Sequence, residues 1–300
     1  DSQRHVGVIF FERSDFSKQQ LEILQAFDLI VTGSLWNQSL LQQLGVSQSQ
    51  LVHQGVDTGL FNNAPVPKLI NRSLVIFSGG KLEARKGQDV VIAAFRRLLQ
   101  VHPDALLIAA WGNLGNVAVE TIGCSPYVQG APSEGRAKGI APWLEANGVP
   151  DKNVWLLPCL VNRQLPNLIK QADVAVFASR CEGGTNLMAM ESLACGVPTL
   201  VSANTGHLDL LELGMEHCLP VGAAGVGCVN PDLIAGYGRD HRGFWGETDP
   251  EELLQWWLKI ASEKVSWRQQ GQQHASAMQS MSWSVSMNRL MNLVKEIESS

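Results

Sequence analysis

Short apolar runs alternate with longer segments of helical spacing along the first part of the chain. Apolar runs at 6–10, 29–32 and 51–54 enclose two helical segments, at 17–27 and 34–45. Strand-like runs that alternate with helical segments predict parallel strands with helices packed on the faces of one sheet. We therefore expect the chain to open with a Rossmann-like α/β unit.

Residues 55–73 interrupt this rhythm, because they contain Asn62, Asn63, Pro65 and Pro67 and show no apolar period. Such a composition is typical of a linker. Beyond it the alternation resumes and predicts a second parallel sheet with helices on both faces. Strands are expected at 74–78, 105–110, 154–157, 174–178 and 199–202, helices at 87–100, up to Gly148, 162–171, 187–195, 249–262 and 284–298, and long loops at 111–132 and 222–247.

The composition is that of a folded protein with more than one domain. The chain has 300 residues, of which 45% are hydrophobic, and a formal net charge of −5. At roughly 150 residues per domain, this length predicts two domains. No block of basic residues is present, so nucleic acid is not expected as a partner. No apolar stretch approaches the roughly 18 residues that span a bilayer, so no transmembrane segment is expected.

Six cysteines are scattered along the sequence without the close pairing of a zinc or redox motif. In a chain of this size they are typical of reduced thiols, which predicts a cytoplasmic location, either free or at the inner face of a membrane. The first ten residues are too polar and too few for a secretory signal. Because the sequence lacks an initiator Met, we expect a processed, trimmed or partial chain.

A basic loop flanked by glycines separates the strand predicted at 74–78 from the helix predicted at 87–100. It offers Gly80 for close backbone approach, the cations Lys81 and Lys86, and a helix N-terminus beside them. Ligands of open parallel sheets lie outside the carboxyl ends of the strands, where cations and a helix N-terminus together form an anion site. Each cation alone is typical of a solvated turn, but the group favours phosphate binding.

A second loop, at 182–186, follows a predicted strand and precedes a helix that is apolar on nearly all sides. Two glycines let its backbone curl, and Thr185 or Asn186 can cap the helix, whose first N–H groups then face a ligand. Glu191 is the only charge on that buried helix. Its carboxylate suits a ribose diol. The alternative is a structural carboxylate that pairs with a backbone N–H or with Arg180.

Together these motifs resemble those of the family-4 retaining glycosyltransferases, the group 1 glycosyl transferases of the GT-B fold. The donor loop of that family reads Gly-Arg-Leu, three residues, Lys-Gly, and here Gly80, Lys81 and Leu82 are followed by Lys86 and Gly87. The second family motif is a pair of Glu residues and then Ala-x-Ala-x-Gly-x-Pro. The resemblance runs from about residue 28 to the C-terminus, with further matches at 55–57, 171–174, 191–198 and 282–283.

The resemblance implies transfer of a hexose from a nucleotide diphosphate sugar to an acceptor hydroxyl, with retention of the anomeric configuration. It implies that Lys81 and Lys86 hold the donor diphosphate. Glu191 would hold the ribose, and Glu182 would approach the transferred sugar as the catalytic residue. The implied donor-binding set also includes Gly80, Gly183, Gly184, Thr185, Asn186 and Leu187. No metal and no resident cofactor are expected, and the acceptor stays open between a glycan, a lipid-linked molecule and a small molecule.

The sequence departs from the family pattern at two points. Glu182 and Glu191 are separated by eight residues, whereas the Glu residues of the family are separated by seven. Either the loop holds one additional residue, or Gly183 takes the place of the first Glu. In addition, the N-terminal unit is short for a GT-B protein, which has two Rossmann-like domains of comparable size. We therefore expect a partial acceptor-side unit with linker at 1–68, a nucleotide-sugar-binding domain at 69–282, and a C-terminal helix at 283–300 that packs back on the N-terminal unit.

Two other functions stay open on the sequence alone. A nucleotide-sugar epimerase of the same fold would need no acceptor, and a nucleotide-sugar-binding fragment would bind the donor without turnover. His207 can line the same cleft, although a single histidine is more often structural. The residues His217, Cys218, Cys228 and His241 lack the spacing of a metal site, and we interpret them as core or loop residues.

Overall fold

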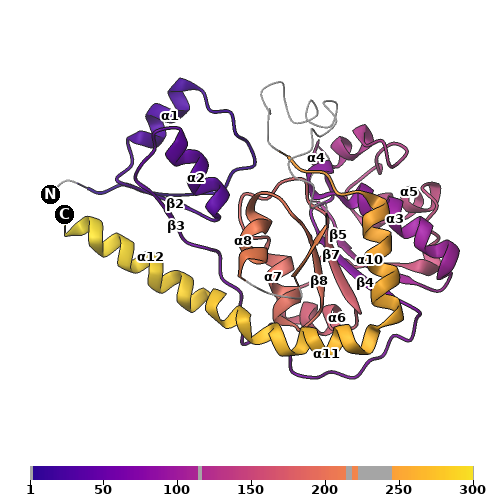
Figure 1. The fold of residues 1–300 in the computed structure, drawn as a ribbon. Helices are drawn as coiled ribbons and strands as arrows, with labels where there is room; N and C mark the ends of the chain where they lie inside the picture. Colours follow the sequence, from indigo (N-terminus) through magenta and orange to yellow (C-terminus); the bar gives the residue numbers. More distant parts are fainter. Residues whose placement is uncertain (1–2, 114–116, 214–217, 222–244, 300) are drawn as a thin grey trace.

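The computed structural model describes residues 3–113, 117–213, 218–221 and 245–299, and these form two parallel sheets flanked by helices (Figure 1). The fold class predicted from the sequence, an α/β architecture with Rossmann-like parallel sheets, is confirmed. Within the described residues, no helix combines the length and apolar character needed to cross a membrane.

The smaller sheet has the strand order β1-β2-β3. Its elements are β1 (Val6–Ile9), α1 (Lys18–Gln25), β2 (Leu29–Thr32), α2 (Leu35–Gln43) and β3 (Ser49–Leu51). The third strand begins two residues before the predicted run at 51–54. It does so because polar Ser49 and Gln50 continue the backbone ladder opposite Ile30 and Val31, a pairing that their side chains do not signal.

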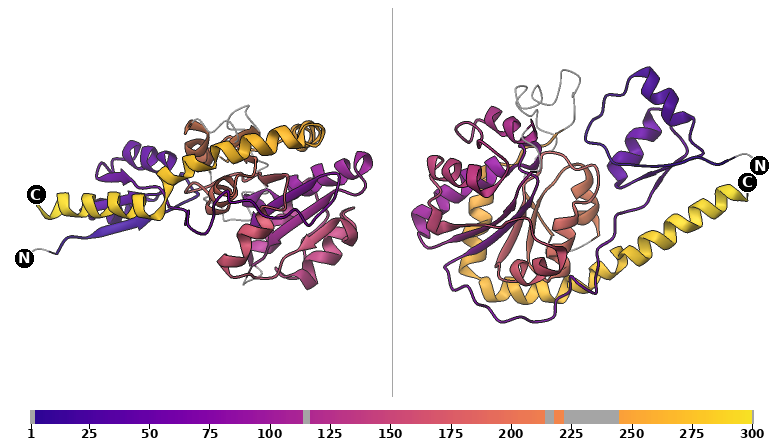
Figure 2. Two further views of the ribbon diagram at one scale, coloured as in Figure 1. Left: turned by 90° about the horizontal axis from the view of Figure 1, so that it is seen from below. Right: turned by 180° about the vertical axis from the view of Figure 1, so that it is seen from behind.

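The C-terminal helix α12 (Trp283–Glu298) lies on the face of the smaller sheet that α1 and α2 leave uncovered (Figure 1). Its Ser282 N-cap accepts a hydrogen bond from the Val285 N–H at 3.4 Å. Leu290, Leu293 and Ile297 of α12 pack against Leu29, Val31 and Val52. The end of the chain thus helps to bury its beginning, and both termini lie at the same end of the molecule (Figure 2).

The larger sheet has the strand order β6-β5-β4-β7-β8-β9, and all of its pairings are parallel. The central strand β4 comes first in the sequence. The next two strands, β5 and β6, extend the sheet on one side of it, and β7, β8 and β9 extend it on the other. The strands are β4 (Val75–Gly80), β5 (Leu106–Trp111), β6 (Val154–Leu156), β7 (Val174–Phe177), β8 (Thr199–Ser202) and β9 (Cys218–Val221).

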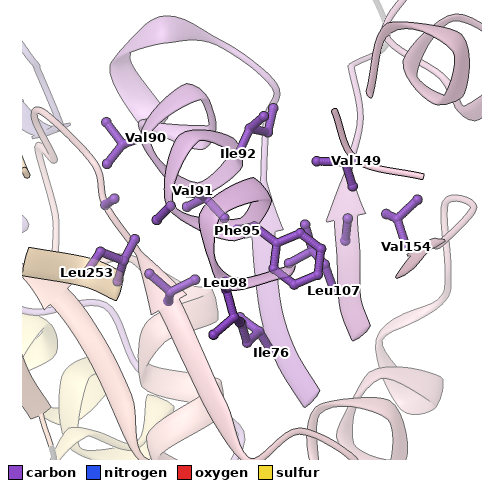
Figure 3. Packing of buried hydrophobic residues seen from close by; sticks show 14 of the residues in the cluster. Ile76, Val90, Val91, Ile92, Phe95, Leu98, Leu107, Val149, Val154 and Leu253 are labelled. Atoms are coloured by element: carbon purple, nitrogen blue, oxygen red, sulfur yellow. The ribbon is translucent and has the colours of Figure 1, made fainter. Parts of the chain in front are cut away.

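Helices cover both faces of this sheet. On one face, α3 (Gln88–Val101), α5 (Ala137–Ala146) and α10 (Pro250–Ser262) enclose an apolar cluster in which Phe95 lies among strand residues such as Ile76 and Leu107 (Figure 3). On the other face lie α6 (Leu165–Ile169), α7 (Leu187–Ala194) and α8 (Leu208–Glu212). This two-sided burial explains why β7 is apolar throughout and why β4 begins with the apolar residues Val75, Ile76 and Phe77.

Several elements were not expected from the sequence. The predicted loop at 111–132 contains α4 (Val117–Glu120) and a short 3-10 helix (Thr121–Cys124), whose Val119 and Ile122 are buried. These segments are too short to show a helical period. Also unexpected are β9 and α11 (Lys264–His274), a mostly polar helix. Most of the loop predicted at 222–247 lies outside the described residues.

Candidate functional site

The two loops that the sequence singles out flank the point at which the larger sheet changes its direction of growth. One loop follows β4 and the other follows β7, and these strands are neighbours. In open parallel sheets a crevice forms outside the carboxyl ends of the strands at this point, because the helices that follow lie on opposite faces. The topology alone therefore places both loops beside one ligand site.

A cavity of about 770 Å³ extends from this point across the carboxyl ends of β4, β5 and β6. Its inner wall is mostly apolar, and cations from the start of α5 lie at its rim. The size and the mixture of surfaces suit a nucleotide. The lining residues are Gly80, Ala110, Trp111, Gly112, Asn113, Gly135, Arg136, Ala137, Lys138, Leu157, Pro158, Cys159, Leu160, Leu165 and Met188.

The loop after β4 contributes to the cavity mainly through Gly80. Its φ angle is +123°, and a Cβ at this position would meet no atom within 4 Å, so the backbone is open to a ligand. Lys81 is exposed, and no hydrogen bond or ion pair of its side chain occurs within the described residues. Gly87 instead packs inward, because a Cβ there would overlap the carbonyl oxygen of Ala178. The start of α3 is therefore covered by protein rather than presented to the cavity.

Lys86 and Glu182 bring the two loops together. The Lys86 Nζ lies 2.7 and 2.8 Å from the two carboxylate oxygens of Glu182. The Ser179 hydroxyl donates to the same carboxylate at 2.6 Å, and Asn186 Nδ2 donates at 3.1 Å. Burial raises the pKa of Glu182, but Lys86 and then Arg85 outweigh it and hold the pKa at about 2. Glu182 is therefore an ionised, fully hydrogen-bonded carboxylate.

Asn186 caps α7 and shapes the entrance to the helix. Its φ angle is +63°, in the left-handed region, and its side-chain oxygen accepts a hydrogen bond from the Ala189 N–H at 3.4 Å. Within the described residues, the N–H groups of Leu187 and Met188 have no acceptor. Thr185, the other candidate cap, is buried and donates its hydroxyl to the sulfur of Met190 at 2.9 Å.

Glu191 has no partner for its carboxylate within the described part of the chain, although it is only 9% exposed. Burial alone raises its pKa to about 7. The pairing with Arg180 that the sequence left open does not occur, because that guanidinium binds Asp89 at 2.6 Å and Glu247 at 2.7 Å. Glu191 thus has a buried carboxylate that no described residue binds, and it lies one turn beyond the N–H groups of Leu187 and Met188.

The glycines of the second loop contact the N-terminal unit rather than open space. A Cβ on Gly183 would come within 2.8 Å of the Phe11 backbone, and one on Gly184 would lie 2.8 Å from the Gln54 side chain. The Ser34 hydroxyl donates to the Gly183 carbonyl at 2.8 Å. Ser34 is the first residue of the helical segment predicted at 34–45, and its contact with Gly183, across 149 positions, has no local signal.

Sequence analysis also missed the cations at the rim of the cavity. Arg136 and Lys138 belong to the N-cap and first turn of α5 and are exposed. The signal that could have found them is a basic pair directly after Gly135, at the start of a helix in an α/β unit. Within the described residues, no three His, Cys, Asp or Glu side chains are grouped as a metal site. His217, Cys228 and His241 lie outside those residues, and Cys218 begins β9.

The comparisons with known proteins define the class of this chain. A family model described as glycosyl transferases group 1 matches residues 62–219, and the chain belongs to this family. The match begins in the predicted linker and ends in β9, so it includes both loops of the site.

Two curated relatives carry glycosyltransferase names. D-inositol 3-phosphate glycosyltransferase of Segniliparus rotundus is 29% identical over 168 residues, which are 53% of this chain and 32% of that protein. Putative glycosyltransferase YtcC of Bacillus subtilis is 24% identical over 220 residues, which are 68% of this chain and 50% of that protein. The chain therefore spans about a third to a half of the length of these relatives.

Solved structures of glycosyltransferases share the fold over nearly the whole chain. Sucrose-phosphate synthase from Thermosynechococcus elongatus superposes with a TM-score of 0.69 at 17% identity, and the match covers 98% of this chain and 68% of that one. Anabaena Alr3699/HepE, solved in complex with UDP and glucose, gives a TM-score of 0.69 at 16% identity and covers 98% and 72%. The predicted GT-B fold is thereby confirmed.

Proposed function

We propose that the chain binds a nucleotide diphosphate sugar in the cavity outside β4, β5 and β6 and transfers the hexose to an acceptor hydroxyl. The observation that carries this proposal is the pair of N–H groups of Leu187 and Met188. They begin α7 without an acceptor in the described residues, and Met188 lines the cavity beside Gly80. N–H groups at the positive end of a helix bind phosphate.

The parts of the donor are assigned by the chemistry of the residues around it. The diphosphate lies at the start of α7, where Lys81 and Lys86 supply positive charge from the loop after β4. The Glu191 carboxylate accepts hydrogen bonds from the ribose hydroxyls, since it has no other partner in the described residues. The base lies against the apolar wall that includes Trp111 and Leu157. Family membership and the UDP bound in the HepE structures support a nucleotide sugar as the donor.

The reaction breaks the bond between the anomeric carbon and the diphosphate and forms a bond from that carbon to the acceptor oxygen. The diphosphate gains negative charge as it leaves, and the N–H groups and lysines already in place stabilise that charge. For retention in a single step, the acceptor hydroxyl reaches the carbon on the face that the diphosphate leaves, and it gives its proton to the departing diphosphate oxygen. Glu182 stays ionised beside Lys86 and is the carboxylate that the transferred sugar approaches.

Calorimetric titration with UDP, GDP and ADP, and with the matching nucleosides, tests this proposal. We expect one of the diphosphates to bind at least tenfold more tightly than its nucleoside, because the phosphates meet both cations and free N–H groups. Incubation with nucleotide sugars and candidate acceptors then tests transfer, and an epimerase would convert the donor without any acceptor. Absence of binding by all three diphosphates would contradict the proposal.

We further propose that donor binding needs neither a metal ion nor a resident cofactor, because the charges of the diphosphate are met by the chain itself. Addition of EDTA should leave the affinity for the nucleoside diphosphate unchanged, as measured in the same titration. A loss of affinity that Mg²⁺ or Mn²⁺ restores would show that a metal takes part.

Described cysteines such as Cys124 and Cys181 are unpaired, which supports a cytoplasmic location.

A further inference from the structure

His207 is buried beside the loop at 182–186 and does not line the cavity. It ends a short 3-10 helix, Thr205–His207, that follows β8, and its side chain is 0% exposed. Its Nδ1 lies 3.0 Å from the Ser202 hydroxyl, and its Nε2 lies 3.2 Å from Asn186 Nδ2. The imidazole thus connects the end of β8 to the cap of α7.

The neighbours of the ring define which nitrogen carries the proton. Asn186 must present its amide nitrogen to Glu182, because its oxygen would be repelled by that carboxylate and is needed by the Ala189 N–H. The same amide group donates to His207 Nε2, which therefore carries no hydrogen. Nδ1 carries the proton and donates it to Ser202, whose own hydroxyl donates to the Ser179 carbonyl.

This arrangement commits all the hydrogen-bonding groups of the Asn186 side chain. One N–H donates to Glu182, the other donates to His207, and the oxygen accepts from Ala189. Asn186 is also one of two non-glycine residues with positive φ in the described part of the chain. A left-handed residue is held only where its surroundings fix it. Asn186 directly precedes Leu187 and Met188, so its conformation sets how the chain enters the turn that carries their N–H groups.

We propose that His207 is a positioning residue of the donor site, which holds Asn186 left-handed and so aims the start of α7 at the donor diphosphate. This role rests on the proposed function. Neutral imidazole is needed, because a protonated Nε2 cannot accept a hydrogen bond. Burial lowers the pKa of His207 to about 4 even though ionised Glu182 opposes this effect, while Lys86 and Arg85 also face the ring. The ring is therefore neutral at pH 7.5.

Two substitutions separate positioning from general support of the fold. In His207→Gln, the side-chain oxygen reaches the place of Nε2 and can still accept from Asn186. In His207→Asn, the amide reaches Ser202 but not Asn186. Titration with the nucleoside diphosphate that the wild type binds best should show at least a tenfold loss for His207→Asn and less than a threefold loss for His207→Gln. Binding of the matching nucleoside should not change in either variant.

The outcomes distinguish the two proposals. Equal diphosphate affinity in His207→Asn and the wild type, with both variants less stable to heat, would overturn positioning and leave a structural histidine. A wild type that binds none of the three diphosphates would overturn the proposed function and this role with it.

The protonation of the imidazole nitrogens can be measured on the wild type itself. In a chain labelled with ¹⁵N-histidine, the His207 signal, assigned by its absence from His207→Gln, should show a protonated Nδ1 and an unprotonated Nε2. The opposite tautomer would overturn the proposal even if the wild type binds the donor, because Nε2–H cannot accept from Asn186.

Discussion

At the scale of single residues, the Glu191 carboxylate lies inside the protein without a partner in the described residues, and its pKa is raised to about 7 by burial. The folded chain therefore keeps this proton up to about pH 7, whereas the unfolded chain releases it near pH 4.5. A group with a raised folded-state pKa contributes its stability below the unfolded pKa and loses it as pH rises between the two values. Ionisation of Glu191 thus lowers the free energy of unfolding, by about 3 kcal/mol once pH exceeds 7.

Glu191→Gln should separate affinity from stability. The amide never ionises, so at pH 8 the variant should unfold at a higher temperature than the wild type, and at pH 4.5 the two should be similar. Affinity for the nucleoside diphosphate should fall by about 1–3 kcal/mol at pH 8, because one carboxylate acceptor becomes a donor that faces a ribose hydroxyl. Thermal unfolding and calorimetry at both pH values measure these effects. Unchanged affinity with a lower unfolding temperature at pH 8 would instead indicate a structural carboxylate.

At the scale of elements, the loops after β4 and β7 are joined by the Lys86–Glu182 pair, whereas Lys81 stands apart at the surface. Both lysines were assigned to the donor diphosphate on sequence grounds, but only one of them also holds the protein together. Substitution of the two lysines therefore separates two quantities. Both changes should affect the affinity for the diphosphate, but only the change at Lys86 should affect the stability of the fold.

Lys81→Ala and Lys86→Ala should each weaken nucleoside diphosphate binding by about 1.5–3 kcal/mol, since each removes a charged contact with phosphate. Only Lys86→Ala should lower the free energy of unfolding, by about 3 kcal/mol, because it leaves the buried Glu182 carboxylate without its closest cation. Calorimetry and urea unfolding check the two effects. Equal losses of affinity for the nucleoside and the diphosphate would contradict the phosphate assignment.

The local features of this site could be predicted from the sequence, but the contacts between distant segments could not. Helix caps such as Asn186 and loop glycines such as Gly80 are local features, and both were identified correctly as features of the loops. The pairing of Lys86 with Glu182 spans 96 positions, and spacing along the chain carries no information on such a contact. The buried Arg180–Asp89 pair is similarly long-range. The sequence therefore could not show whether Arg180 pairs with Asp89 or with Glu191.

At the scale of the whole molecule, the smaller unit contacts the larger one at the loop at 182–186. Asp209 of α8 accepts a hydrogen bond from the Leu35 N–H, at the start of α2, at 2.9 Å, and lies 2.7 Å from His53 Nε2. The neighbouring Ser34 hydroxyl binds the Gly183 carbonyl. The N-terminal unit thus supports the same segment that carries Glu182. Sequence analysis predicted both sheets, but not that their contact would fall on this loop.

The cover that α12 gives to the smaller sheet should contribute measurably to stability. The double substitution Leu290→Ala and Leu293→Ala removes side chains that pack on Leu29 and Val31, and should lower the free energy of unfolding by about 1–3 kcal/mol, as partly buried leucines do. The matched control is Met287→Ala, on the exposed side of the same helix, which should change it by less than about 0.5 kcal/mol. Equal effects of the two changes, measured by urea unfolding, would contradict this packing.

The central claim is that the start of α7 receives the donor diphosphate, and backbone NMR on a chain labelled with ¹⁵N-leucine and ¹⁵N-methionine tests it most directly. The N–H signals of Leu187 and Met188 should shift strongly when the preferred nucleoside diphosphate is added, because phosphate oxygens accept hydrogen bonds from these groups. The matching nucleoside should move them little. Saturated diphosphate binding that leaves both signals in place would contradict the account.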